Sequence, residues 1–157
     1  MHRSMTSLVA GGIHNFGAHM GDQMIPPDSS NPKGHFEDAE FKRLNERILS
    51  SAGGTWCDPP SEIAIMSQKN TYDLLIQKLV ERKKRDPIWG WKDPRTTLTI
   101  KLFVPYLKNP HFVCCFRDPV EVAKSLQVRN KFSIEKGLQL AEIYNQRLLE
   151  FLQWYYF

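Results

Sequence analysis

The stretch HFVCCFRDP, residues 111–119, decides which class of fold the sequence predicts. Its first six residues are mostly apolar and do not alternate with polar ones, which is typical of a strand buried on both faces of a parallel sheet. Asp118 and Pro119 then form the pattern of a helix start, with aspartate as N-cap and proline at the first helical position. Glu121, three residues after the cap, is placed as in a capping box. The stretch therefore predicts a buried strand that leads into a helix.

A second stretch, IWGWKDPR at residues 88–95, is written in the same way. IWGW is short, aromatic and β-prone, and Asp93 and Pro94 again indicate a helix start. Two strand-to-helix junctions predict an α/β fold, with a central parallel sheet flanked by helices. In such sheets ligands collect at the carboxyl ends of the strands. We therefore expect the chemistry at KDPR, at RDP and at HRSMTS, residues 2–7.

The remaining pattern is helical. Apolar residues recur at helical spacing in EDAEFKRLNERILSS, residues 37–51, and two glycines follow as a stop signal. Similar spacing predicts helices over 67–84 and 134–157. Residues 4–20 predict a further helix that Ser4 caps and several glycines weaken. No internal repeat is present in the sequence.

Length and composition indicate one globular domain over residues 1–157. The chain has 41% apolar and 24% charged residues, which is ordinary for such a domain. No apolar run approaches the roughly 18 residues that a membrane span needs, and no signal peptide is visible. The odd number of cysteines, with Cys114 next to Cys115, does not form a disulfide framework. We expect reduced thiols, a cytoplasmic protein and no membrane partner.

The charge balance favours an anionic ligand. The chain has 21 basic and 17 acidic residues, which gives a net charge of +4. Part of the excess lies in ERKKR, residues 81–85, after an apolar helical pattern. Basic residues suit a helix C-terminus, so the run is interpreted as a solvated helix end, with nucleic-acid binding as the alternative. We expect no nucleic-acid partner.

HRSMTS has the residue types of an anion-binding loop. Arg3 supplies a guanidinium, and Ser4, Thr6 and Ser7 supply hydroxyl groups at the mouth of the first predicted helix. The loop lacks the glycines and lysine of a Walker A sequence, which argues against an ordinary ATPase or GTPase. The alternative interpretation of these residues is a plain helix N-cap.

Arg117 and Ser125 form a second candidate for anion binding. Arg117 ends the predicted strand 111–116, and Ser125 follows it by eight residues, about two turns into the next helix. That spacing lets both side chains reach one group above the strand end. The alternative is that Arg117 pairs with a carboxylate while Ser125 faces solvent.

Four motifs, in order, resemble the sulfotransferases that use 3′-phosphoadenosine 5′-phosphosulfate (PAPS). HRSMTS is similar to the family's loop of a basic residue, Ser, Gly, Thr and Thr or Ser, except at Met5, where the family has glycine. FRDPVEVAKSL, 116–126, matches the family's strand-end arginine and the serine eight residues later. NPKGHFED, 31–38, and GWKDPR, 90–95, resemble segments of the bacterial branch whose loop is His-Arg-Ser-Gly-Thr-Ser.

The resemblance implies a P-loop-like three-layer fold and a nucleotide site. The loop residues Arg3, Ser4, Met5, Thr6 and Ser7 would hold the 5′-phosphosulfate. Arg117 and Ser125 would hold the 3′-phosphate. Family members begin with a strand before the loop and continue beyond a helix like the last one here, so the chain resembles a partial sulfotransferase domain without its first strand.

The transfer reaction itself requires a base and a cation but little covalent chemistry. Glu37, at the entry to a predicted helix, is the first choice for the base that takes the acceptor's proton, and His35 is the rival. The alternative for Glu37 is a favourable charge at a helix N-terminus. Lys92 is the candidate cation for the leaving phosphate, with a surface ion pair as its alternative. Asp93 is the next candidate base, and no metal is expected.

The predicted function is transfer of a sulfuryl group from PAPS to a hydroxyl or amine of a small molecule, glycan or peptide. One alternative is a non-catalytic nucleotide-binding relative, impaired by Met5 and by the missing terminal segments. A basic module that binds nucleic acid or another partner is the third possibility.

Overall fold

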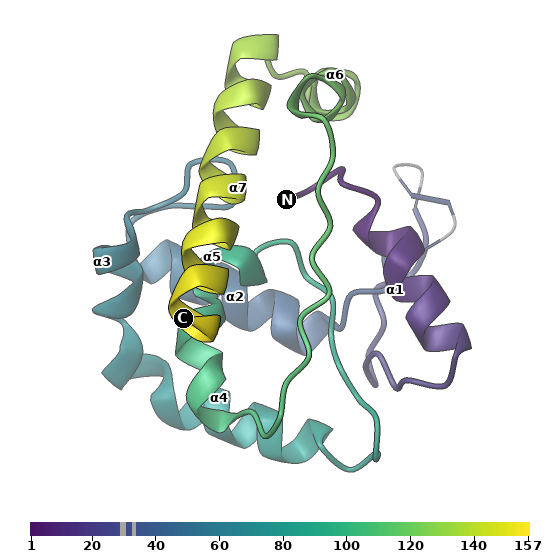
Figure 1. The fold of residues 1–157 in the computed structure, drawn as a ribbon, viewed down its shortest axis with the longest axis vertical. Coiled ribbons are helices and arrows are strands. Elements are labelled where there is room, and N and C mark those ends of the chain that lie inside the picture. The colour runs from purple at the N-terminus through teal and green to yellow at the C-terminus, as the bar shows by residue number, and fades with distance from the viewer. Residues whose placement is uncertain (29–30, 33) are drawn as a thin grey trace. The chain divides into compact units, whose positions relative to one another are not determined.

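A computed structural model describes residues 1–28, 31–32 and 34–157 of the chain (Figure 1). The chain divides into two compact units. Unit 1 comprises Met1–Thr6 and Phe112–Phe157, and unit 2 comprises Ser7–His111. The described helices are α1 Thr6–Asn15, α2 Ala39–Ser51, α3 Glu62–Met66, α4 Lys69–Lys83, α5 Thr96–Phe103, the 3-10 helix η1 Val104–Tyr106, α6 Pro119–Asn130 and α7 Ile134–Tyr156.

The predicted α/β fold with a central parallel sheet is wrong. Among the described residues no strand forms, and β-type pairing is limited to the isolated bridges His19–Trp89, Met24–Asp38 and Asp28–Asn31. The P-loop-like architecture, which requires a strand and a sheet, is therefore also wrong for this chain.

The stretch 111–116 shows why the strand prediction failed. A strand needs a neighbouring backbone to bond with, and this segment forms no bridge to another part of the described chain. It is not buried on both faces either, because Val113 and Phe116 are exposed while Phe112 packs edge-on against Phe151 of α7, with 4.9 Å between the ring centroids. IWGW contributes a single bridge, through Trp89, in place of a strand.

Unit 1 consists of α6 and α7 with the short N-terminal segment. Asp118 caps α6 as predicted, since its carboxylate accepts hydrogen bonds from the backbone N–H groups of Val120 and Glu121. The predicted helix over 134–157 is confirmed as α7. Gly137 permits the close packing of the two helices, because a Cβ there would lie 2.6 Å from the Cα of Ala123.

Unit 2 has its core between α2, α4 and α5. The predicted helices over 37–51 and 67–84 are confirmed as α2 and α4. Phe41 and Ile48 of α2 are buried, and Trp91 stacks on Phe41 with 4.3 Å between ring centroids. The short helix α3 was not predicted.

Two predicted helix starts and ends in unit 2 are corrected. The helix expected over 4–20 is shorter, α1, and the chain leaves it at Gly17, whose φ of +97° suits glycine. Asp93 does not cap α5, which begins at Thr96, because the Asp93 carboxylate is engaged in a buried network described below.

None of the helices in the described ranges combines the length and apolar character that crossing a membrane requires.

Candidate functional site

The two predicted halves of the nucleotide site meet within unit 1. The Arg3 Nε donates a hydrogen bond of 2.7 Å to the Ser125 hydroxyl, across 122 residues of sequence. Arg117 Nη1 donates to the Arg3 carbonyl oxygen at 2.8 Å. Arg3 is therefore hydrogen-bonded both to Arg117, which precedes the Asp118 cap of α6, and to Ser125 in the middle of α6. The guanidinium groups of Arg3 and Arg117 and the Ser125 hydroxyl lie in one region.

The backbone of the same segment is strained. Arg3 has φ +66° and Met5 has φ +60°, in the left-handed region that non-glycine residues rarely adopt. Met5 is largely exposed, whereas Ser4 between them is buried. Met5 therefore stands in a glycine-like conformation.

The last two loop residues belong to the start of α1. Thr6 is the first residue of the helix, so Ser4, the predicted cap, lies two residues before its start. Ser7 lies in unit 2, where its hydroxyl accepts a hydrogen bond of 3.2 Å from the Asn31 side-chain amide. The side chain of Asn31 in turn donates to the Gly34 carbonyl oxygen at 2.6 Å. Ser7 is therefore linked to the segment NPKGHFED, residues 31–38. Lys33 of that segment lies outside the described residues.

The candidate base and cation pair with each other in unit 2. The Lys92 ammonium donates to Glu37 Oε1 at 2.7 Å, and both side chains are largely buried. Arg95 Nη1 lies 3.8 Å from the other carboxylate oxygen. The surface ion pair considered for Lys92 is excluded, because this pair is formed inside the unit. Glu37 lies before the N-cap of α2, and Lys92 lies just before α5.

His35 is directed to a different partner. Its Nε2 lies 3.0 Å from a carboxylate oxygen of Asp28. Phe36, between His35 and Glu37, has φ +51°, and its ring packs against Gly11 of α1. Strained non-glycine residues often mark functional segments, and here the strain lies between the two candidate bases.

Asp93 is the centre of a buried network that sequence reasoning missed. Asn45 of α2 donates to Asp93 Oδ2 at 2.9 Å, and the Arg95 backbone N–H and Nη1 donate to Oδ1 at 3.0 and 2.8 Å. The Thr99 hydroxyl of α5 donates to the side-chain oxygen Oδ1 of Asn45 at 2.7 Å. Burial raises the pKa of Asp93, while the Arg95 charge opposes that rise. Because both oxygens are occupied, Asp93 serves to hold α2 and α5 together and is poorly placed as a base.

A sequence signal for this network was available. Asn45 lies next to Leu44 on the face of α2 whose apolar residues are buried, and Asn45 itself is fully buried. A buried amide needs hydrogen-bond partners, so an asparagine on a core face indicates a polar network. Its partners were not predictable, because they come from residues some fifty positions further along the chain.

Lys83 is an exception to the interpretation of ERKKR as a solvated helix end, because it is buried while the other four residues of the run are exposed. Its buried ammonium lies 2.7 Å from Asp22, 2.9 Å from Asp38 and 2.8 Å from Glu40. We call these four residues the Lys83 cluster. The three carboxylates lie close enough to suggest a cation site, and the Lys83 ammonium already binds all of them.

Asp38 is the fully buried carboxylate of the Lys83 cluster. Burial alone would raise its pKa, but hydrogen bonds from Lys83 and from the backbone N–H groups of Glu40 and Gln23 lower it below 3.8. Burial opposes the charge of Lys83 too, yet its three carboxylate partners raise its pKa. A carboxyl with a lowered pKa in the folded state stabilises the fold above its unfolded pKa, and that contribution is lost as the pH falls through the folded value.

Comparisons of the chain with models of protein families, with curated proteins and with solved structures find no match.

Proposed function

We propose that the chain binds PAPS and transfers its sulfuryl group to a hydroxyl or amine acceptor. The observation that carries the proposal is the hydrogen bond from Arg3 to Ser125 within unit 1. These residues come from two motifs 122 residues apart in the sequence, and the resemblance assigns both motifs to the same nucleotide. The hydrogen bond from Arg117 to the Arg3 carbonyl supports the same grouping.

In this proposal the first loop and the residues around the start of α6 supply the phosphate contacts. Arg117 and Ser125 bind the 3′-phosphate through charge-assisted and neutral hydrogen bonds. The segment Arg3–Ser7 binds the 5′-phosphosulfate. Guanidinium groups suit this role because they present several N–H donors to the oxygens of one phosphate.

The proposed reaction also needs a proton acceptor and a cation. The acceptor's oxygen or nitrogen forms a bond to the sulfur, and the bond from sulfur to the 5′-phosphate oxygen breaks with its electron pair on that oxygen. Glu37 takes the acceptor's proton, and 3′-phosphoadenosine 5′-phosphate (PAP) leaves. Lys92 stabilises the negative charge that develops on the leaving phosphate. His35 remains the rival base, and the reaction as proposed uses no metal.

Cytoplasmic localisation is part of the proposal. It is supported by the three cysteines, all of which are free thiols.

A non-catalytic nucleotide-binding relative is the second candidate. The observation in its favour is the left-handed backbone of Met5, because a side chain there obstructs the approach of the loop to a ligand. Nucleic-acid binding is less favoured, since Lys83 of the basic run is neutralised by the Lys83 cluster.

The test combines binding with turnover. PAP binding is measured by calorimetry, and release of PAP from PAPS is followed with a panel of phenols, sugars and amines. Acceptor-dependent release supports the transferase, and binding without release supports the non-catalytic relative. Absence of PAP binding, or strongly salt-dependent binding of DNA or RNA in its place, contradicts both.

A further inference from the structure

We infer that Glu121 competes with a bound phosphate for Arg117 and thereby lowers the affinity of unit 1 for the nucleotide. The inference rests on the proposed nucleotide site and adds a residue that sets its affinity and its preference between nucleotides.

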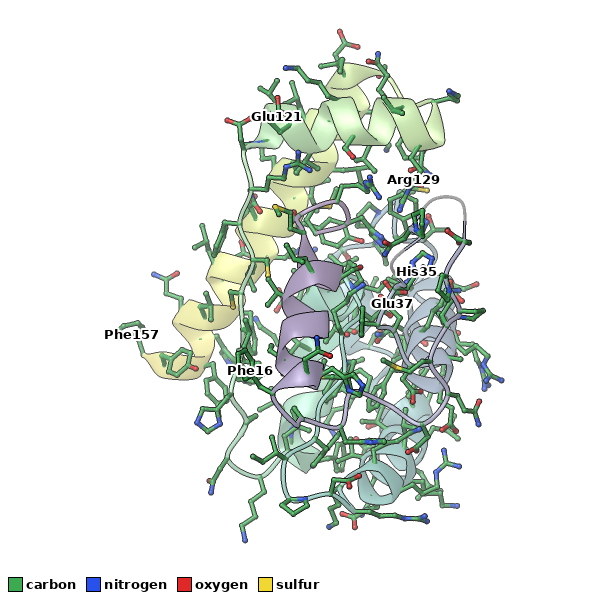
Figure 2. The ribbon with its side chains drawn as sticks, turned by 90° about the vertical axis from the view of Figure 1, so that its right-hand side faces the viewer. Phe16, His35, Glu37, Glu121, Arg129 and Phe157 are labelled. Atoms are coloured by element: carbon green, nitrogen blue, oxygen red, sulfur yellow. The ribbon has the colours of Figure 1, made fainter. Side chains whose placement is uncertain are left out.

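Glu121 is placed between the two residues assigned to the 3′-phosphate. Arg117, Glu121 and Ser125 follow one another at intervals of four residues. In α6 this spacing puts Glu121 and Ser125 on one face, one turn apart. Figure 2 shows Glu121 at the end of α6 where the chain enters the helix, whereas Arg129 lies toward the other end.

The Glu121 carboxylate is shared between two cations. Its Oε2 lies 3.7 Å from Arg117 Nη2, and its Oε1 accepts a hydrogen bond of 3.0 Å from Lys124 Nζ. Arg117 uses its other terminal nitrogen, Nη1, for the Arg3 carbonyl. The part of the Arg117 guanidinium not bound to Arg3 is therefore directed at a carboxylate in the first turn of α6.

A phosphate that binds Arg117 and Ser125 meets this carboxylate as a like charge. Binding then requires that the Glu121 carboxylate move away from Arg117. The carboxylate can remain bound to the Lys124 ammonium when it does so. Glu121 and Lys124 are about half exposed or more, so solvent screens both the attraction that is lost and the repulsion that is added. An exposed pair of this kind changes an affinity by about three- to fivefold.

The alternative role for Glu121 is to favour the N-terminus of α6. Its backbone N–H already bonds the Asp118 cap at 3.1 Å, and that bond does not involve the side chain. Glutamine keeps the size of the side chain and is equally compatible with a capping box. The substitution Glu121→Gln therefore removes the charge and leaves the helix start intact.

The experiment measures the dissociation constants of PAP and of AMP by calorimetry. Glu121→Gln is compared with wild type and with Glu142→Gln, which makes the same change of charge at an exposed position of α7. We expect Glu121→Gln to tighten PAP binding about three- to fivefold with AMP unchanged, and Glu142→Gln to change neither.

A second comparison isolates Lys124. If Lys124 acts by retaining Glu121, Lys124→Met weakens PAP binding in the wild-type background and has a smaller effect in the Glu121→Gln background. If Glu121→Gln unfolds normally in urea and binds PAP as wild type does, while wild type prefers PAP to AMP, the inference about Glu121 is overturned and the proposed 3′-phosphate site is not. Equal wild-type affinities for PAP and AMP overturn the proposed 3′-phosphate site and this inference together.

Discussion

The left-handed backbone at Met5 gives a stability prediction that separates strain from side-chain packing. A non-glycine residue in that region costs about 1–2 kcal/mol, and glycine costs about 0.4–1 kcal/mol more than alanine in unfolded-chain entropy. Met5→Gly and Met5→Ala lose the same partly exposed side chain, but only glycine relieves the strain at φ +60°. We therefore expect Met5→Gly to be more stable than Met5→Ala by about 1 kcal/mol.

The assay is equilibrium unfolding in urea, with Lys131 as the matched site. Lys131 has φ +58° and is the C-cap of α6 in the same unit. The difference between Lys131→Gly and Lys131→Ala should be of the same size. PAP affinity should differ between the two positions. Met5→Gly should tighten PAP binding up to about tenfold, which is the effect of one further hydrogen bond from the loop backbone to the phosphate. Lys131→Gly should leave PAP affinity unchanged.

Two results would refute this reasoning. Equal stability of the glycine and alanine variants at position 5 would mean that the loop carries no strain there. Tighter PAP binding in Lys131→Gly as well as in Met5→Gly would mean that the gain comes from general stability and not from the loop.

Three further predictions concern unit 2. Lys83→Met leaves the buried Asp38 carboxylate uncompensated and should lower the free energy of unfolding at neutral pH by about 3–5 kcal/mol, against less than about 1 for Lys84→Met at an exposed ion pair; the difference between Lys83→Met and wild type should shrink in acid, because wild type loses the contribution of Asp38 as the pH falls through its lowered pKa. Asn45→Ala leaves buried partners unsatisfied and should cost about 2–4 kcal/mol by urea unfolding. Glu37→Gln should lower kcat by about 10²–10⁴ with PAP affinity nearly unchanged, while His35→Ala costs little; the opposite pattern would exchange the two roles.

The helices were predictable because their signals are local. Apolar spacing and the glycine stop identified α2, and the Asp118–Pro119 pair identified the start of α6. The stretch 111–116 carries the composition of a buried strand, but a sheet depends on neighbouring strands that no local pattern guarantees. This difference explains why the helix predictions were confirmed and the sheet was not.

The motifs named residues that contact one another in the structure, and the role of these residues in nucleotide binding stays a prediction. The contact between Arg3 and Ser125 agrees with the grouping that the motifs implied, and Glu37 and Lys92 lie within hydrogen-bond distance of each other. The partner of Asn45 could not be predicted. A buried amide needs a hydrogen-bond partner, but the sequence does not indicate which residue supplies it.

The central claim is tested most directly by the relative affinities of PAP and AMP for the wild-type chain and for Arg117→Met. The two nucleotides differ only in the 3′-phosphate, which the account assigns to Arg117 and Ser125. Wild type should prefer PAP by roughly 1–3 kcal/mol, and Arg117→Met should lose most of this preference while AMP affinity stays nearly constant. Equal affinities in wild type, or a preference for PAP that survives in Arg117→Met, would contradict the proposed 3′-phosphate site.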